Sequence, residues 1–219
     1  AAMRRSFFHY PAPRPEDNEL YSQFRYTELE GFDYHGGDGT ISRRDPTKVI
    51  FEKGRYYVWY TRRSTPTVPQ GAEKCTDTIP STDWDLSEIW CATSEDGFTW
   101  KEQGVAVPRP PKPHPGWRSV ATPGILKFKG KYYHYYQAFS DPSMTRGAYC
   151  PISVSSADSP DGPWTPANEE TGPTGQPGEW DQFAVQDPNP LVHDGKIYLY
   201  YKSAFNRPHD LWVAQGLAI

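Results

Sequence analysis

The sequence has little of what membrane, nucleic-acid-binding and helical proteins require. Only 36% of its 219 residues are hydrophobic, and no apolar run approaches the roughly 20 residues that cross a membrane. The 23 Lys and Arg residues are outnumbered by 27 Asp and Glu residues and form no long basic cluster. A polyanion-binding surface needs such a cluster. We therefore expect neither a nucleic-acid partner nor a membrane partner, and the low hydrophobic content disfavours a helical bundle.

Cysteine is also scarce. Cys75, Cys91 and Cys150 leave at least one thiol unpaired and lack the spacing of metal ligands. Cys91 lies in an apolar run, which predicts a buried free thiol. The sequence does not open with a signal-peptide pattern, although a mature secreted chain would have lost one. The cysteines therefore predict no metal site and do not specify a cellular compartment.

Proline, glycine and aromatic residues are abundant instead, with 23 Pro, 18 Gly and 15% aromatic residues. A pattern built from them recurs three times: a start that contains proline, an apolar stretch, then glycine, a basic residue and aromatic residues. Its glycines, Gly54, Gly130 and Gly195, are 76 and 65 residues apart. This spacing suits four-stranded propeller blades with loop insertions. A propeller ring closes only with four or more blades. We therefore expect an all-β propeller of which this chain is a part, with assembly from another chain as the alternative.

Two of the three copies open with an aspartate, Asp45 or Asp187, and the middle copy opens with Thr122. The first strand of each blade lines a propeller's axis, so we expect both aspartates to begin such strands and to converge on one pocket. Paired carboxylates are typical of glycosidic bond hydrolysis, in which one acts as general base and the other tunes a neighbour's pKa. The alternative is that Asp-Pro only starts a strand, since Asp accepts turn hydrogen bonds and Pro tolerates an edge.

Other residues are candidates for binding a sugar, whose C–H faces stack on aromatic rings and whose hydroxyls meet polar groups. Trp84 is a loop tryptophan suited to stacking. Arg44 can pair with Asp45 or bind a hydroxyl, with a plain surface ion pair as the alternative. The further polar candidates are His35, Thr122, Gln137 and Gln186. Repeat or strand positions predict packing between blades for Trp59, Trp100, Trp164 and Trp212.

Several runs of residues resemble glycoside hydrolase family 117. They are residues 18–21 (NELY), 31–34 (GFDY), 37–46 (GDGTISRRDP), 156–164 (SADSPDGPW) and 186–190 (QDPNP). The resemblance covers essentially the whole chain. Members are α-1,3-(3,6-anhydro)-L-galactosidases, or neoagarobiose hydrolases. The resemblance implies a five-bladed β-propeller that releases 3,6-anhydro-L-galactose from the non-reducing end of neoagaro-oligosaccharides, with inversion, in agarose degradation.

The resemblance also implies roles for individual residues. Asp45 matches the general base, and Asp187 matches the acidic residue that supports the acid partner. Trp84, Thr122 and Gln137 match sugar-contacting positions. No cofactor is implied; some members hold a divalent cation near the site, but no ligand cluster in this sequence predicts one. The family's general acid, a histidine, comes from a later blade, so we expect the isolated chain to be inactive.

The resemblance divides the chain at residue 40. Residues 1–40 are expected to be an irregular segment, the remnant of a dimerisation arm, and residues 41–219 the first two to three blades of the catalytic propeller. The complete protein is expected to be a homodimer. Its location is expected to be the periplasm or the outside of a bacterial cell, with the cytoplasm as the alternative.

Two other functions stay open. One is a five-bladed arabinan or fructan hydrolase, which also carries aspartates in its first and third blades, although the run at residues 37–46 disfavours it. The other is a propeller that binds carbohydrate without catalysis.

Overall fold

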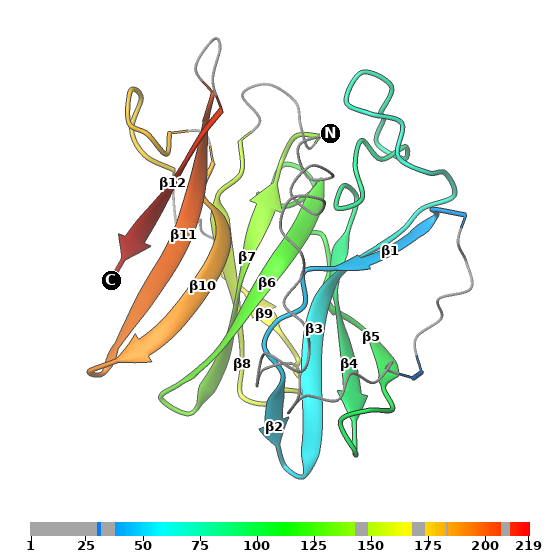
Figure 1. Cartoon of the computed structure of the whole chain (residues 1–219), viewed down its shortest axis with the longest axis vertical. Helices are drawn as coiled ribbons and strands as arrows, with labels where there is room; N and C mark the ends of the chain where they lie inside the picture. Colours follow the sequence, from blue (N-terminus) through cyan, green and yellow to red (C-terminus); the bar gives the residue numbers. More distant parts are fainter. Residues whose placement is uncertain (1–29, 32–37, 143–148, 168–173, 183, 207–210) are drawn as a thin grey trace, which may run out of the picture.

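The structure is a computed structural model that describes residues 30–31, 38–142, 149–167, 174–182, 184–206 and 211–219. These residues form three antiparallel sheets that lie side by side in chain order (Figure 1). Among them, no helix is long and apolar enough to cross a membrane. The sheets are successive blades of a five-bladed-propeller fold, as the sequence predicts. The described residues form three separate sheets and do not close a ring.

The first blade has the strand order β1-β3-β4-β5, with β2 also paired to β3. Its strands are β1 (Ile41–Arg44), β2 (Ile50–Glu52), β3 (Arg55–Ser64), β4 (Glu88–Ser94) and β5 (Lys101–Val107). The second blade has the order of the chain, with β6 (Ser119–Phe128), β7 (Lys131–Phe139), β8 (Ile152–Ala157) and β9 (Thr165–Pro166). The third comprises β10 (Gln186–His193), β11 (Lys196–Asn206) and β12 (Leu211–Ala218).

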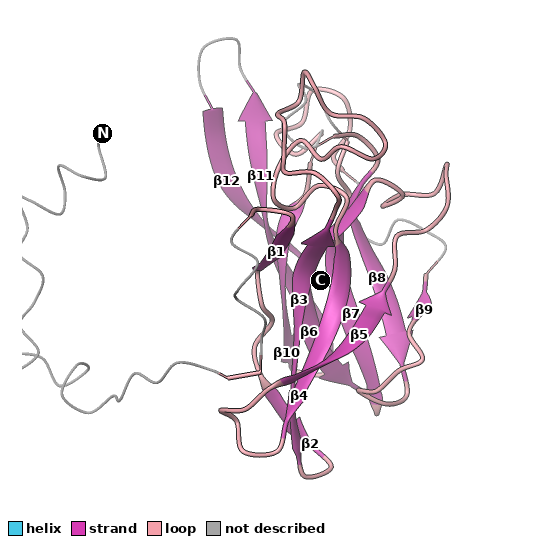
Figure 2. Ribbon diagram, turned by 90° about the vertical axis from the view of Figure 1, so that its right-hand side faces the viewer, coloured by secondary structure: helices cyan, strands magenta, loops and turns pink. Residues whose placement is uncertain are grey.

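The hairpin turns of the three blades explain the repeated glycine. Each turn pairs a residue at φ 47–52° with a glycine at φ 70–82°: Lys53-Gly54, Lys129-Gly130 and Asp194-Gly195. Positive φ at both central residues is the geometry of a type I′ turn, which matches the twist of the flanking strands. The predicted hairpin at Lys53-Gly54 is confirmed. All three hairpins point to one side (Figure 1), and the long loops gather at the opposite end of the strands (Figure 2).

The prediction that Asp45 and Asp187 begin strands is wrong in detail, and Thr122 has the same kind of position. β1 ends just before Asp45, and β6 and β10 begin upstream of Thr122 and Asp187. The register shifts between Ala121 and Gly124, and between Gln186 and Asn189. The left-handed backbone at Asp45, Thr122 and Asp187 interrupts the hydrogen-bond ladder between strands. The inner strand of each blade therefore begins before this residue and is broken at it.

Two hydrophobic cores lie between the blades. The first joins the first and second blades through residues such as Trp59, Ile89, Val120 and Tyr136. The second joins the second and third blades through Leu126, Tyr135, Ile152, Val185 and Leu199. Trp59 is buried in the first core and Trp164 packs against it, as predicted. Trp100 is also buried, but in a cluster formed within the first blade. The side chain of Trp212 lies outside the described residues. Each blade is thus stabilised by its neighbour.

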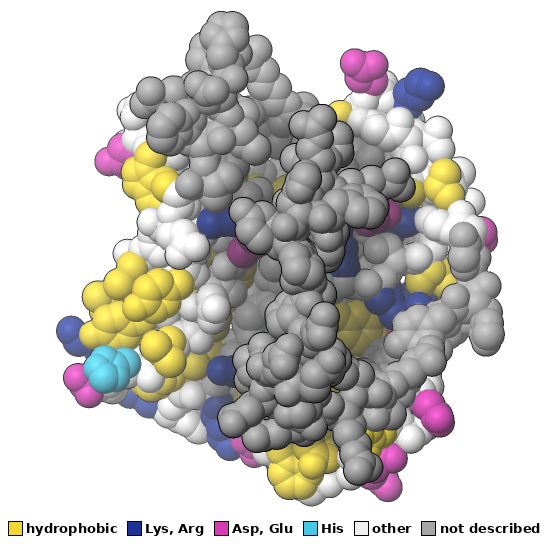
Figure 3. Space-filling view, in the orientation of Figure 1, with side chains coloured by type: hydrophobic (Ala, Val, Ile, Leu, Met, Phe, Trp, Pro, Cys, Tyr) yellow, Lys and Arg dark blue, Asp and Glu magenta, His cyan; other side chains and the backbone are white. Residues whose placement is uncertain are grey.

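The third blade exposes apolar side chains. Leu191, Val192, Tyr200 and Leu217 are 37–52% exposed. By the strand register, Leu191, Tyr200 and Leu217 lie on the same face of the sheet. Figure 3 shows an apolar surface over β10 and β11. In a propeller, the faces of successive blades pack against each other.

Glycine is required at position 31 by a close approach of two backbones. Glu30 pairs with Thr99, and its N–H and C=O bond the carbonyl of Phe98 and the N–H of Trp100 at 3.1 and 2.8 Å. Gly31 has φ 93°, and a Cβ there would lie 1.7 Å from the Trp100 carbonyl oxygen. Gly31, the first residue of the run at residues 31–34, therefore lies directly against the backbone of Trp100, next to β5.

His134 lies in the first interblade core without a polar partner. It is 0% exposed, and both ring nitrogens lack a hydrogen bond. Its ring lies 4.8 Å from that of Trp59 and 4.1 Å from that of Trp164. Burial lowers the pKa of His134 to about 3 from its ordinary 6.5. The neutral ring therefore acts as a flat packing group, in agreement with the structural role that its strand position suggests.

This histidine is expected to make the protein sensitive to acid. Between pH 6.5 and about 3 the unfolded chain binds a proton at position 134 that the folded chain does not. Stability is therefore lost as the pH falls through this range, by about 1.4 kcal/mol for each pH unit at most. The change His134→Phe should flatten the pH dependence of the urea unfolding midpoint between pH 7 and 4.5. His193→Gln, at an exposed position, should leave that slope as it is; equal slopes in wild type and H134F would contradict the prediction.

Candidate functional site

The site is organised by three residues with the same unusual backbone. Asp45, Thr122 and Asp187 all have φ 51°, and each is followed by a proline. Left-handed backbone is uncommon outside glycine, and for a β-branched residue such as Thr122 it is an outlier. A proline also disfavours helical backbone in the residue before it. Strain of this kind persists where the surrounding structure imposes it, and it clusters at functional sites.

These three residues form a layer between two cavities. Toward the hairpins, a cavity of about 410 Å³ is lined by the layer, by the prolines that follow it and by the inner strands. On the side of the long loops, a cavity of about 220 Å³ is lined by Arg44, Asp45, Trp84, Thr122, Gln137, Phe139, Gln186, Asp187 and Lys202. The second cavity, here called the acidic-pair cavity, contains both aspartates and a tryptophan. Its volume lies below the roughly 300–1,000 Å³ of sites for drug-sized ligands, and it suits one small unit such as a sugar ring.

Asp45 is held by groups from two blades. The Nε of Arg44 donates to Oδ2 of Asp45 at 2.9 Å, and the hydroxyl of Thr122 donates to the same oxygen at 3.4 Å. The Thr122 backbone N–H in turn donates to the hydroxyl of the fully buried Thr61 at 2.7 Å. The Asp45 side chain is 26% exposed, so its carboxylate is held in place but accessible to water.

Asp187 is paired with a lysine from the neighbouring strand. The Lys202 ammonium forms an ion pair with Oδ2 of Asp187. The side chains are 41% and 42% exposed. Each carboxylate of the acidic-pair cavity therefore has its own cation, Arg44 for Asp45 and Lys202 for Asp187.

Trp84 is presented to the cavity by a buried polar network. Its carbonyl oxygen accepts hydrogen bonds from the hydroxyls of Ser87 and Ser119, at 2.8 and 2.5 Å. Next to it, Asp85 receives two hydrogen bonds from Arg118, at 2.7 and 2.5 Å, and the two side chains are 0% and 1% exposed. The guanidinium of Arg44 lies 4.5 Å from the centre of the Trp84 ring. The backbone of Trp84 is thus held by Ser119 of the second blade, and its indole ring packs against Arg44 of β1.

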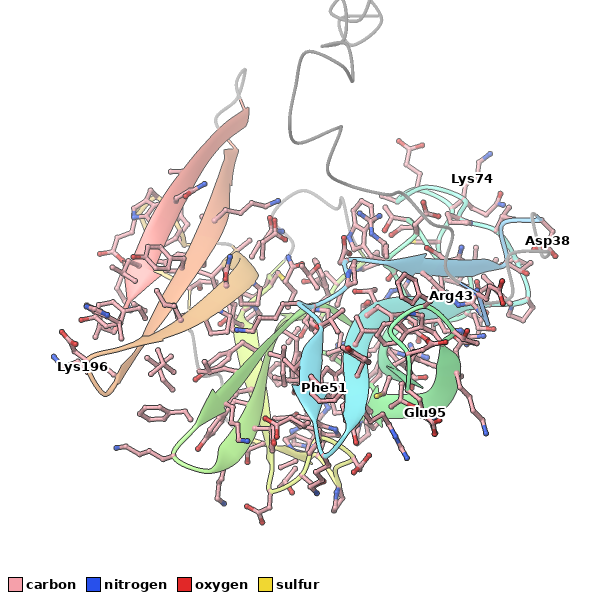
Figure 4. The ribbon with its side chains drawn as sticks, turned by 60° about the horizontal axis from the view of Figure 1, so that its bottom comes forward. Asp38, Arg43, Phe51, Lys74, Glu95 and Lys196 are labelled. Carbon is pink, nitrogen blue, oxygen red and sulfur yellow. The ribbon has the colours of Figure 1, made fainter. Side chains whose placement is uncertain are left out.

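The segment that leads to Asp45 is fixed at both ends of β1 (Figure 4). The Asp38 carboxylate accepts from the N–H and hydroxyl of Thr40 at 2.9 and 2.7 Å. The buried Arg63 donates to the carbonyls of Gly39 and Thr40 at 2.7 and 3.0 Å. Arg43 holds Glu102 with two hydrogen bonds at 2.9 and 3.0 Å, and this Arg43 contact is the main reason that the pKa of Glu102 is lowered. The described part of this run, residues 38–46, is therefore held against the first blade by hydrogen bonds at both ends of β1.

Gln137 lines the cavity from β7 and is 5% exposed. Its Nε2 lies 4.0 Å from the sulfur of Cys150, within reach of a weak hydrogen bond. Burial raises the pKa of the Cys150 thiol, so the thiol is protonated and unreactive. Cys91 is likewise a buried free thiol, as predicted. The Gln137 amide can therefore be directed at a ligand from a rigid, mostly buried strand.

Most of the residues selected from the sequence come together. Seven line the acidic-pair cavity: Arg44, Asp45, Trp84, Thr122, Gln137, Gln186 and Asp187. His35 lies outside the described residues. Sequence reasoning missed Phe139 and Lys202. The signal for Lys202 is the repeat itself, because Thr61, Gln137 and Lys202 each follow their hairpin glycine by seven residues.

In the described residues, no group of three or more His, Cys, Asp or Glu side chains lies close enough to hold a metal ion. Among the residues that line the acidic-pair cavity, Asp45 and Asp187 have such side chains.

A cavity enclosed by propeller blades, with two carboxylates and an aromatic side chain, is typical of a glycoside hydrolase. Residues 55–217 match the family model described as glycosyl hydrolases family 43, so the chain belongs to the propeller glycoside hydrolases that this model describes. The chain is also similar to Zg3597, a family 117 glycoside hydrolase produced by the marine bacterium Zobellia galactanivorans. The TM-score is 0.82 and the identity is 62%, over 88% of this chain and 56% of that chain. Among the propeller hydrolases, this chain belongs to glycoside hydrolase family 117.

More distant structures share the fold alone. CoXyl43, a family 43 β-xylosidase/α-arabinofuranosidase from a compost microbial metagenome, has a TM-score of 0.55 and 23% identity over 80% of this chain and 46% of that chain. A thermostable family-43 glycoside hydrolase has a TM-score of 0.56 and 18% identity over 89% and 56%. No curated protein sequence matches this chain. The chain thus spans about half the length of the solved structures that it matches.

The ion pair of Asp85 and Arg118 is expected to be essential for the position of Trp84. Asp85→Asn leaves the buried guanidinium of Arg118 without its buried counter-charge, which costs about 3–5 kcal/mol. The urea midpoint should fall, and the loop at residues 65–83 should become a site of limited proteolysis. Asp77→Asn is the matched control, because the Asp77 side chain also faces Arg118, at 3.8 Å, but is 70% exposed. Equal losses in the two variants would contradict the prediction.

Proposed function

We propose that this chain is the catalytic part of an exo-acting, inverting hydrolase that cleaves α-1,3 bonds of neoagaro-oligosaccharides. The product is 3,6-anhydro-L-galactose, released from the non-reducing end. One observation carries the proposal: Asp45 and Asp187 occupy the same left-handed position in two blades and line one cavity. The 62% identity with a family 117 enzyme supports the choice within the hydrolases.

Asp45 is proposed as the general base. A base must accept a proton from water next to the anomeric carbon, so its carboxylate has to be ionised, oriented and open to the cavity. Arg44 and Thr122 both direct their donors to Oδ2 of Asp45. In the proposed mechanism, Oδ1 of Asp45 accepts the proton of the attacking water molecule. The partners on Oδ2 hold the carboxylate in that orientation.

Asp187 is proposed as the second acidic residue, which supports the group that protonates the leaving oxygen. It lies in the third blade, and Thr122 and Asp45 lie in the second and first. A leaving oxygen on the Asp187 side and a water on the Asp45 side would be on opposite faces of the sugar ring, as inversion requires. The general acid itself is assigned to the part of the longer relatives that this chain does not span.

The remaining residues of the cavity are proposed to recognise the sugar. Trp84 offers an aromatic face, and the Arg44 guanidinium lies 4.5 Å from the centre of its ring. Gln137 and Gln186 supply amides, and Thr122 a hydroxyl, for the sugar hydroxyls. His35 is proposed to contact the substrate on the strength of its sequence position alone. The small number of polar groups around one aromatic face suits a single neutral sugar unit.

A pentose-releasing hydrolase is the second candidate, because the family 43 model matches residues 55–217. The substrates separate the two. The proposed neoagaro-oligosaccharide hydrolase releases 3,6-anhydro-L-galactose from neoagarobiose and acts poorly on arabino- or xylo-oligosaccharides. A pentose-releasing hydrolase shows the opposite preference. A protein that binds these sugars without releasing any is a carbohydrate-binding module.

The decisive variant is Asp45→Asn in the full-length gene product. Loss of the base should reduce kcat on neoagarobiose by about 10²–10⁴-fold, the usual contribution of general base catalysis. Circular dichroism and the thermal midpoint should stay close to wild type, because the Asp45 side chain is partly exposed. Asp158→Asn, at a side chain that is 86% exposed, is the control and should keep full activity. Wild-type turnover that persists in D45N would remove Asp45 from the mechanism.

A further inference from the structure

Each blade places a second residue opposite the left-handed layer. The ladder pairs Thr61 with Arg44, Gln137 with Ala121, and Lys202 with Gln186. In every blade the partner is the residue just before the left-handed one. The second strand therefore supplies one side chain per blade at the level of the acidic-pair cavity, and the three blades use a hydroxyl, an amide and an ammonium there.

These three side chains have different partners, and two of them contact the layer. Thr61 accepts the backbone N–H of Thr122, and Gln137 approaches Cys150. Lys202 is the charged member of the set, and it forms an ion pair with the side chain of Asp187 itself. Only in the third blade does the second-strand residue hold the functional carboxylate directly.

The two cations of the cavity are held differently. Arg44 is next to Asp45 in the chain and also lies over Trp84, so its guanidinium has contacts on two sides. Lys202 comes from β11, and Asp187 is its ion-pair partner among the described residues. An ammonium has three N–H donors and one of them serves Asp187, so the other two can bind sugar oxygens. The four charges also sum to zero, which suits a neutral sugar.

We propose that Lys202 is a positioning residue for Asp187: its ammonium holds the Asp187 carboxylate at the cavity wall and directs its other donors to the bound sugar. The role rests on the proposed function, because Asp187 is the group that it positions. A merely structural ion pair at this exposure contributes little to stability. Loss of Lys202 should therefore reduce turnover far more than it reduces the stability of the fold.

The test uses three variants of the full-length gene product. Lys202→Met removes the charge and keeps the aliphatic stem, whereas Lys202→Arg keeps the charge. Lys196→Met is the matched control, since Lys196 is exposed on the same strand at the hairpin end, away from the cavity (Figure 4). We expect K202M to lower kcat on neoagarobiose by about 10–100-fold, the usual cost of a misplaced catalytic group, and to raise KM. K202R should recover most of kcat, and K196M should equal wild type, with all thermal midpoints unchanged.

Two results would overturn the proposal. One is K202M activity within about twofold of wild type while Asp187→Asn is inactive. The other is an activity loss that is matched by a fall in the thermal midpoint and is not recovered by K202R, which would make the ion pair structural.

Crystal structures of the variants test Lys202 without reference to any reaction. In K202M we expect the Asp187 carboxylate to turn away from its wild-type position, and in K202R to keep it. An Asp187 side chain that stays in place in K202M would refute the positioning role, whatever the substrate. If wild type releases no sugar from neoagarobiose, the proposed function fails, and these structures still decide the role of Lys202.

Discussion

The site depends on one backbone constraint, a left-handed residue that precedes a proline in the inner strand of each blade. This conformation costs on the order of 1–3 kcal/mol at each position and needs support from the surrounding structure. The support comes from paired strand on both sides of the interruption and, at Thr122, from the buried hydroxyl of Thr61. The backbone shape is the same in all three blades, with φ 51°. The residue type at each copy then decides its chemistry: a carboxylate in two blades and a hydroxyl in one.

Buried polar contacts, rather than apolar packing, hold the loops of the site. Arg118 and Asp85 fix the loop that carries Trp84, and Arg63 fixes the segment before β1. A buried ion pair is a weak source of stability, since the desolvation of two charges offsets their attraction. It restricts geometry strongly, however, because a displaced partner leaves a buried charge without compensation. The interblade cores stabilise the fold, and these pairs orient the loops around the cavity.

Much of the architecture could be predicted from local pattern. The dipeptide before each basic residue, such as Lys53-Gly54, specifies a hairpin, and the repeat of this hairpin indicates blades. The interruption at Asp45 was missed, because an Asp-Pro pair looks the same whether it starts a strand or breaks one. Lys202 was missed because a lysine in an alternating strand resembles a solvent-exposed residue. Its position next to Asp187 can be inferred only by counting seven residues along the strand from the hairpin glycine, Gly195, as in the other two blades.

The sequence by itself determined the repeat, the hairpins and the residue types at equivalent positions, because these follow from backbone preferences within a few neighbouring residues. The tertiary structure alone decided which side chains meet. Thr122 reaches Asp45 across 77 residues of sequence, and Arg118 reaches Asp85 across 33. Such contacts depend on how one blade packs against the next through the cores around Trp59 and Leu126. No local pattern encodes that packing, because it is set by the fit of side chains from distant segments.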